Sequence, residues 1–192
     1  MKHTVVALVE DRPGVLNRVA SLFRRRGFNI DSLAVGATEE SGISRMTIVL
    51  DGADGIVEQV EKQLYKLIDV VKVSDLTKEE AVSRELALIK VRCTAEQRPE
   101  VLNLINIFRA QVIDVTPTSL IIQVVAGGET LAALLDNLRP YGIREMVRTG
   151  RIAMVRGTRA TAVHEKESET AQRFHSEGGR RPDETELPFV SK

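Results

Sequence analysis

Hydrophobic residues in the amino-terminal part of the chain switch between strand-like and helix-like spacing. Residues 2–10 are rich in Val and Leu and predict a mostly buried strand, which the turn-forming residues 11–14 end. From Val15 onward apolar side chains recur on one face of a helix, and Gly27 stands where a C-cap glycine is expected. The chain therefore begins with a strand and an amphipathic helix.

Residues 30–76 add two strands, a helix and a final strand to this beginning. Residues 30–37 and 44–50 predict two strands joined by a turn at 41–42, residues 56–67 a second amphipathic helix, and residues 70–76 a closing strand. The order βαββαβ predicts a ferredoxin-like α+β fold, in which both helices cover one face of a four-stranded antiparallel sheet. The other sheet face needs a cover, and we expect oligomerisation to supply it.

An internal repeat predicts a second, divergent copy of this unit. The motif Arg-Pro-x-Val-Leu-Asn at residues 12–17 recurs at residues 98–103. Two more pairs follow in the same order, Phe23-Arg24 with Phe108-Arg109 and Ile30-Asp31 with Ile113-Asp114. The elements expected in the second copy are strands at 87–92, 113–115, 120–125 and near 152–155, and helices at about 99–110 and 129–138.

After residue 157 the periodic apolar positions stop. Residues 158–192 are rich in Glu, Ser, Thr, Arg and Gly and cannot bury enough apolar surface to offset the entropy of ordering. We therefore expect an amino-terminal domain at 1–77, a second domain at 84–157 and a disordered tail at 158–192. A short apolar segment at 186–190 could dock on a partner, although a loose terminus is the simpler expectation.

Composition narrows the class of protein. With 43% hydrophobic residues, no Trp and only 4% aromatic residues, the core must be aliphatic, and stacking platforms for nucleic acid are not expected. Lys and Arg number 27, as do Asp and Glu, so no net charge attracts nucleic acid or anionic lipid. The apolar run at residues 4–9 is too short for a signal peptide or a membrane span, which predicts a cytoplasmic protein.

The sequence offers no convincing catalytic residues. The histidines are His3, at the start of a strand, and His164 and His175, in the tail, and none has a partner for acid–base chemistry. The single cysteine, Cys93, lies in an apolar stretch where an inert buried thiol is expected.

Two glycine-containing loops resemble known ligand motifs without meeting their requirements. Residues 51–55 lack the alternating oxygen ligands and the final Glu of a calcium loop. Residues 127–129 lack the Lys-Ser/Thr of a phosphate loop and the third glycine of a dinucleotide site. Both predict strand-to-helix turns, and no metal site or cofactor site is expected.

The loop at residues 11–14 is the best candidate for binding a small molecule. It precedes the amino end of a helix, where unpaired N–H groups and the helix dipole suit a carboxylate. Gly14 would let a ligand approach the main chain without a Cβ in the way. Asn29, at the start of the next strand, adds an amide that can accept from an ammonium group or donate to a carboxylate. Together these features predict an amino-acid site.

A purely structural role would account for the same residues. Asp11 would be a helix N-cap, Pro13 and Gly14 would shape the turn, and Asn29 would follow a helix C-cap. The second copy has Glu100 in place of Gly14, which would fill the approach and repel a carboxylate. If the site exists, we expect it in the first copy only.

The segments at 7–16 (ALVEDRPGVL), 22–33 (LFRRRGFNIDSL) and 44–48 (SRMTI) resemble the small regulatory subunits of acetohydroxyacid (acetolactate) synthase, and more broadly the ACT domains. The segment at 108–115 (FRAQVIDV) resembles the carboxy-terminal domain of the same family. The resemblance covers roughly residues 1–157.

This resemblance implies a regulatory subunit without a catalytic centre. Its partner would be the large subunit, which would hold thiamine diphosphate, Mg and FAD and join two 2-oxoacid units in branched-chain amino-acid biosynthesis. The small subunit would raise that activity and confer feedback inhibition by valine or another branched-chain amino acid. No cofactor would be bound by this chain itself.

The resemblance also implies where the effector binds. In the family it lies between the amino-terminal domains of a homodimer, and the matching residues here are Asp11, Gly14, Val15, Leu16, Asn29 and Ile30. Backbone amides near Gly14 would hold the carboxylate, and apolar side chains would hold the isopropyl group.

One position departs from the family pattern. Some members have Asn where Asp11 stands, and an aspartate can pair with the ammonium group of the ligand but opposes its carboxylate.

Two other hypotheses for the function of the chain remain open. One is a stand-alone ACT-type sensor regulating another enzyme or a transcription factor, and the other is a small enzyme.

Overall fold

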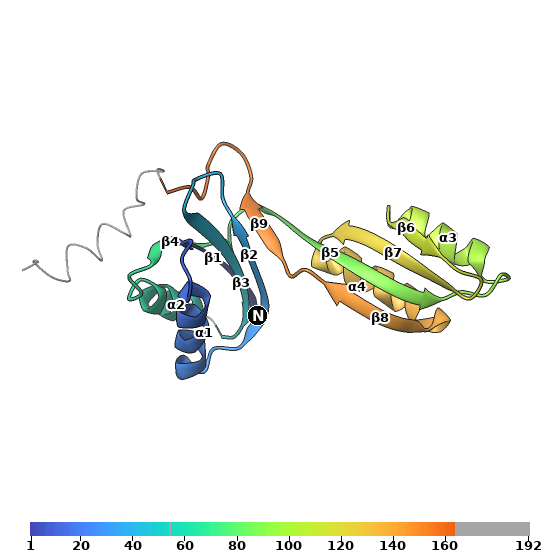
Figure 1. Ribbon diagram of the computed structural model, residues 1–192, viewed down its shortest axis with the longest axis horizontal. Helices are drawn as coiled ribbons and strands as arrows, with labels where there is room; N and C mark the ends of the chain where they lie inside the picture. Colours follow the sequence, from blue (N-terminus) through green and yellow to red (C-terminus); the bar gives the residue numbers. More distant parts are fainter. Residues whose placement is uncertain (54, 164–192) are drawn as a thin grey trace, which may run out of the picture.

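The computed structural model describes residues 1–53 and 55–163, which form two α+β domains joined by a two-stranded ribbon (Figure 1). In this part of the chain no helix is both long enough and apolar enough to span a bilayer. The terminal segment 186–190 and most of the predicted tail lie outside the described residues.

The amino-terminal domain has the predicted βαββαβ order. Its antiparallel sheet, in the order β2-β3-β1-β4, is formed by β1 (Lys2–Glu10), β2 (Ile30–Ala37), β3 (Ile43–Asp51) and β4 (Val70–Asp75). Its helices are α1 (Val15–Arg26) and α2 (Ile56–Leu64). Both helices cover the same sheet face (Figure 1), and Phe23, Ile48 and Leu64 in the core between them are at most 1% exposed.

The second domain repeats that arrangement. Its elements are β5 (Ala81–Arg92), α3 (Arg98–Ile107), β6 (Gln111–Val115), β7 (Ser119–Ala126), α4 (Gly128–Leu138), the short helix η1 (Arg139–Tyr141), β8 (Ile143–Arg148) and β9 (Ile152–Val155). The strand order β6-β7-β5-β8 matches that of the first sheet. Ile89, Leu120 and Leu134 fill a separate core that also buries Cys93.

The prediction that residues 152–155 close the second sheet was wrong. The closing strand is β8, which pairs with β5 from Ala87 opposite Arg148 to Val91 opposite Ile143. Most of β8 is exposed at the sheet edge, and half of its sequence, IREMVR, is charged. The sequence of β8 therefore gave no strand prediction, whereas the run of apolar residues in β9 did.

One face of β9 packs against the first domain through Ala153 and Val155, while Ile152 and Met154 on the other face are exposed. The strand pairs with Ala81–Arg84, an early part of β5 that extends beyond the second sheet. Ala153 and Leu76 bury Val6 of β1 on the sheet face opposite the helices. The chain itself therefore covers the outer face of the first sheet, a role that we expected another subunit to fill.

The segment after β9 continues that cover. We call residues 156–163 the strap. It contacts the first domain and the linker that follows it through Arg45 Nη1 with Thr161 Oγ1 at 2.8 Å, Lys72 Nζ with the Ala162 carbonyl at 2.9 Å, and Arg159 with Glu79 at 3.2 Å. The disorder predicted from residue 158 therefore does not describe residues 158–163, because charged and polar side chains of the first domain bind their backbone and hydroxyl groups.

Candidate functional site

The loop between β1 and α1 is shaped by Gly14. This residue is the N-cap of α1 and has a φ of 88°, in the left-handed region that glycine adopts without strain. No side chain caps the helix, and the N–H of Asp11 donates to the Gly42 carbonyl at 2.8 Å. The interpretation of Asp11 as an N-cap was therefore wrong, since the turn brings Gly14 rather than Asp11 to the cap position.

The amino end of α1 presents free hydrogen-bond donors. The N–H of Val15 donates to the Arg12 carbonyl at 3.3 Å, and the Gly14 carbonyl accepts from Arg18 N–H at 3.0 Å. The N–H groups of Leu16 and Asn17 have no partner within residues 1–53 and 55–163. Two unpaired amides at the positive end of a helix dipole suit a carboxylate.

Arg18 contributes to the same surface and was not predicted from the sequence. Its Nε and Nη2 donate to the buried Asp69 carboxylate at 2.7 and 2.9 Å. A methyl group added to Gly14 would lie 3.6 Å from its third nitrogen, Nη1. The spacing of four residues from Gly14 places Arg18 on the same helix face, which is the signal in the sequence that could have identified it.

The two apolar residues expected at the loop have different surroundings. Val15 is only 3% exposed and belongs to the core, so it can offer a ligand its backbone but not its side chain. Leu16 is 46% exposed and is free to contact a ligand. Of the two apolar residues predicted to contact a ligand beside Gly14, only Leu16 has an accessible side chain.

Asn29 and Ile30 lie far from Gly14 in the same chain. Gly14 precedes α1 and Asn29 follows it, so the helix, which is 12 residues and therefore about 18 Å long, separates the two. The sheet register agrees, because Ile30 is opposite Leu50 and Leu50 is opposite His3, at the other end of β1. One copy of the chain therefore does not bring all the predicted site residues together.

Two hollows in the surface lie elsewhere. One of about 330 Å³ lies between β2 and β9, and one of about 460 Å³ lies between the strap and the β2–β3 hairpin. Neither is lined by residues 11–16 or 29–30. The loop at Gly14 is therefore separate from both hollows.

The corresponding helix of the second domain begins differently. There Thr94 turns back on the amino end of α3, with its carbonyl accepting from Arg98 N–H at 3.1 Å. The Arg98 guanidinium donates to the Thr116 and Pro117 carbonyls, and Glu100 stands in the first turn of the helix. These contacts support the expectation that any effector site belongs to the first copy.

Comparisons with known proteins agree over both domains. Residues 6–72 match the family model described as "AHAS small subunit-like ACT domain", and residues 84–157 match "Small subunit of acetolactate synthase". The chain is 56% identical over 159 residues to a probable acetolactate synthase small subunit of Archaeoglobus fulgidus, covering 83% of this chain and 99% of that one. The chain belongs to the acetolactate synthase small subunits.

Further relatives support this assignment. The acetolactate synthase small subunit of Mycolicibacterium smegmatis is 54% identical, with 82% of this chain and 92% of that protein covered. The crystal structure of the small subunit from Thermotoga maritima, 42% identical, has a TM-score of 0.76 and covers 83% of this chain and 99% of that one. The small subunit is a regulatory, non-catalytic component of an enzyme of branched-chain amino-acid biosynthesis. Among the described residues no cluster of His, Cys, Asp and Glu is arranged to bind a metal ion.

Proposed function

We propose that this small subunit binds valine, or another branched-chain amino acid, between the ACT domains of two copies and transmits feedback inhibition to the large subunit. The observation that carries the proposal is the pair of unpaired amides, Leu16 and Asn17, beside the left-handed Gly14. Arg18, which is ion-paired with Asp69, adds the donor group Nη1 beside Gly14. A zwitterion with a short apolar side chain fits this surface.

Each part of such a ligand has a partner of suitable chemistry. The carboxylate would accept hydrogen bonds from the Leu16 and Asn17 amides and lie near Arg18. The ammonium group would pair with Asp11, which is exposed and is not used to cap the helix. The exposed side chain of Leu16 would contact the isopropyl group. This division of roles also accommodates an aspartate where some relatives carry asparagine.

A second copy would complete the site. Because Gly14 and Asn29 lie at opposite ends of α1, a two-fold axis that sets two α1 helices antiparallel brings Gly14 of each copy to Asn29 and Ile30 of the other. The strand β2 is an edge of its sheet, with Val35 47% exposed, and offers free backbone groups for such a pairing. A homodimer of this kind has two equivalent effector sites.

The activity controlled by this site belongs to the large subunit. We infer that the large subunit holds thiamine diphosphate, Mg and FAD, that it joins two 2-oxoacid units, and that the two subunits meet in the cytoplasm. The extent of the similarity to acetolactate synthase small subunits supports this role over a stand-alone sensor of another enzyme. Capture of the large subunit by the full chain, tested by pull-down, would distinguish the two.

The decisive experiment uses two glycines of the same conformation. Gly14 and Gly55 are both helix N-caps of the first domain, with φ of 88° and 90°. Gly14→Asp places a carboxylate against the ligand carboxylate, so acetolactate production by the reconstituted enzyme should become insensitive to valine while activation by the small subunit persists. Gly55→Asp imposes the same backbone strain and should leave inhibition intact. Loss of activation together with inhibition in Gly14→Asp would contradict a separate effector site.

A further inference from the structure

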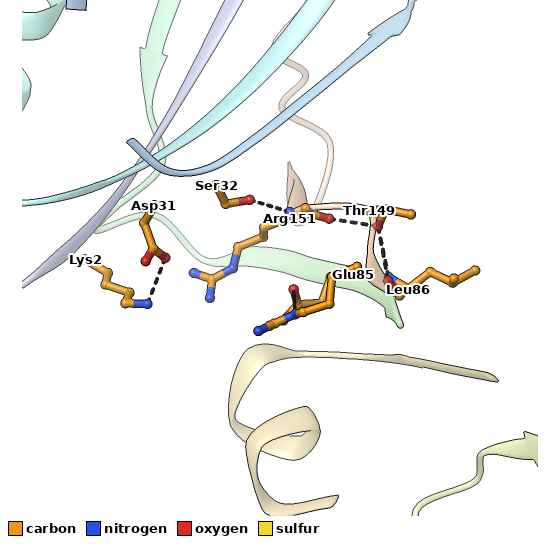
Figure 2. A network of polar contacts seen from close by, with 9 residues as sticks. Lys2, Asp31, Ser32, Glu85, Leu86, Thr149 and Arg151 are labelled. Atoms are coloured by element: carbon orange, nitrogen blue, oxygen red, sulfur yellow. Dashed lines mark hydrogen bonds and ion pairs between the residues drawn. The ribbon is translucent and has the colours of Figure 1, made fainter. Parts of the chain in front are cut away.

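The short connection between β8 and β9 touches the strand that begins at the proposed effector site. The N–H of Arg151 in this connection donates to Ser32 Oγ of β2 at 2.8 Å, which Figure 2 shows as a link between the two domains. Ser32 lies only two positions after Ile30. A residue of one domain is thereby joined to the edge strand of the other.

Gly150 brings the two backbones close together. Its φ of 86° is in the left-handed region, and a Cβ on it would lie 3.0 Å from both the Leu33 carbonyl oxygen and Ser32 Oγ. A side chain at this position would require Leu33 and Ser32 to shift by a few tenths of an ångström. The contact is therefore tight enough for a displacement of one side to move the other.

On the side of the second domain, the connection is held firmly. Thr149 N–H donates to the Leu86 carbonyl at 3.1 Å, and Leu86 N–H donates to Thr149 Oγ1 at 3.2 Å. Directly before it, the Arg148 guanidinium makes a two-pronged ion pair with Glu85, a carboxylate that is 6% exposed. The connection therefore moves with the second sheet.

On the side of the first domain, the strand is irregular at this point. The pairing of β2 with β3 shifts register between Ile30 and Ser32, so Asp31 is an extra residue in the strand. Its carboxylate is held by Lys2 Nζ at 2.8 Å, also drawn in Figure 2. An irregularity between the effector residues and Ser32 lets the strand end adjust when a ligand or a second copy engages it.

We propose that the contact of Ser32 with Gly150 and Arg151 is the coupling joint through which effector binding reorients the second domain. This inference rests on the proposed function. Ligand bound at Asn29 and Ile30 shifts the start of β2, Ser32 moves with it, and the β8–β9 connection transfers the movement to the second sheet. Coupling requires that the two domain orientations bind valine with different affinity, and it must act equally in both directions.

The test measures that coupling from the valine side. Calorimetry would give the valine dissociation constant of the full chain alone and in complex with the large subunit, and the ratio of the two is the coupling factor. Ser32→Ala removes the acceptor of the Arg151 N–H and should bring the ratio roughly fivefold closer to one, the effect of losing one hydrogen bond. Valine affinity of the free variant should be unchanged. Ser74→Ala, on the opposite edge strand and without a bond to the second domain, is the matched control.

A second pair of variants tests the close approach. Gly150→Ala should reduce the coupling factor as Ser32→Ala does, because its methyl group displaces β2. Gly157→Ala carries similar strain, with a φ of 79°, but meets no atom within 4 Å, and should retain normal coupling.

Three results would overturn the proposal. Unchanged coupling in both Ser32→Ala and Gly150→Ala would exclude the joint while leaving the effector site standing. An equal loss of coupling in the Ser74→Ala control would also exclude the joint and leave the effector site standing. Absence of any heat when valine is added to the wild-type complex would instead refute the proposed function, and the joint with it.

Discussion

The two sheets of this small subunit have matching strand orders but differ in how their outer faces are covered. On the outer face of the first sheet Leu8 is 3% exposed and Val49 is fully buried, because β9, Leu76 and the strap lie over this region. On the second sheet Leu88, Val125 and Val147 are 38%, 56% and 57% exposed. One repeated unit has thus produced one covered sheet and one open sheet.

This difference separates burial that the local sequence predicts from burial that it does not. The inner face of each sheet is covered by helices of the same repeat, so its burial follows from local periodicity. The outer face depends on chain that arrives from elsewhere, and only the first sheet receives it within the described residues. A substitution on one outer face should therefore have consequences that the equivalent substitution on the other does not.

The largest expected effect comes from a matched pair of leucines. Leu8 lies in β1 and Leu88 in β5, the corresponding strand of the second sheet, and both side chains are on the outer face. Leu8→Lys buries an ammonium group beside its cross-strand neighbours Arg45 and Lys72, and should lower the free energy of unfolding by about 3 kcal/mol. Leu88→Lys should change it by roughly 0.5 kcal/mol or less. Denaturant titration of the two full-length variants measures both values, and equal losses would remove the distinction between the faces.

Removing the strap should have an intermediate effect. A chain ending at residue 157 loses the contacts of Thr161 with Arg45 and of Ala162 with Lys72, and its free energy of unfolding should fall by about 1–2 kcal/mol. A chain ending at residue 163 keeps these contacts and serves as the control. Binding of an apolar dye should increase only in the shorter chain. If both truncations behave alike, the strap does not cover the first sheet in solution.

The smallest expected effect depends on pH and concerns the first domain alone. Burial, together with the nearby charges of Asp75 and Glu58, raises the pKa of Glu61 on α2. As the pH rises from about 4, the unfolded chain releases this proton before the folded chain does, so the folded state loses stability until the raised pKa is passed. Glu61→Gln should therefore increase stability above that window by roughly 0.5 kcal/mol or less and leave it unchanged below. Thermal unfolding from pH 4 to pH 8 checks this, and a gain confined to acid pH would contradict it.

Much of the fold follows from periodicity and turn residues. The βαββαβ order of the first domain, the helix stop at Gly27 and the repeat in the second domain were all predicted. The strand β8 was missed because Arg144, Glu145 and Arg148 interrupt its apolar residues, so no alternating apolar pattern marks this exposed edge. The apolar β9 took its place in the prediction, although it serves the neighbouring domain.

The candidate site was anticipated in part. Gly14 and the free amides after it follow from a glycine before an amphipathic helix, and Leu16 is exposed as a binding residue requires. Arg18 was overlooked, since its position beside Gly14 depends on its ion pair with Asp69, 51 residues further along the chain. The burial of Val15 likewise depends on the direction in which α1 packs.

By itself, the sequence determined which segments become strands and helices, where glycine ends or begins a helix, and that the chain holds two copies of one unit, because these depend on neighbours within a few residues. Only the tertiary structure decided which outer face is covered, which arginine lies beside the Gly14 loop and where β2 meets the β8–β9 connection. Those contacts join residues far apart in the chain, and they follow from how whole layers pack together rather than from any local pattern.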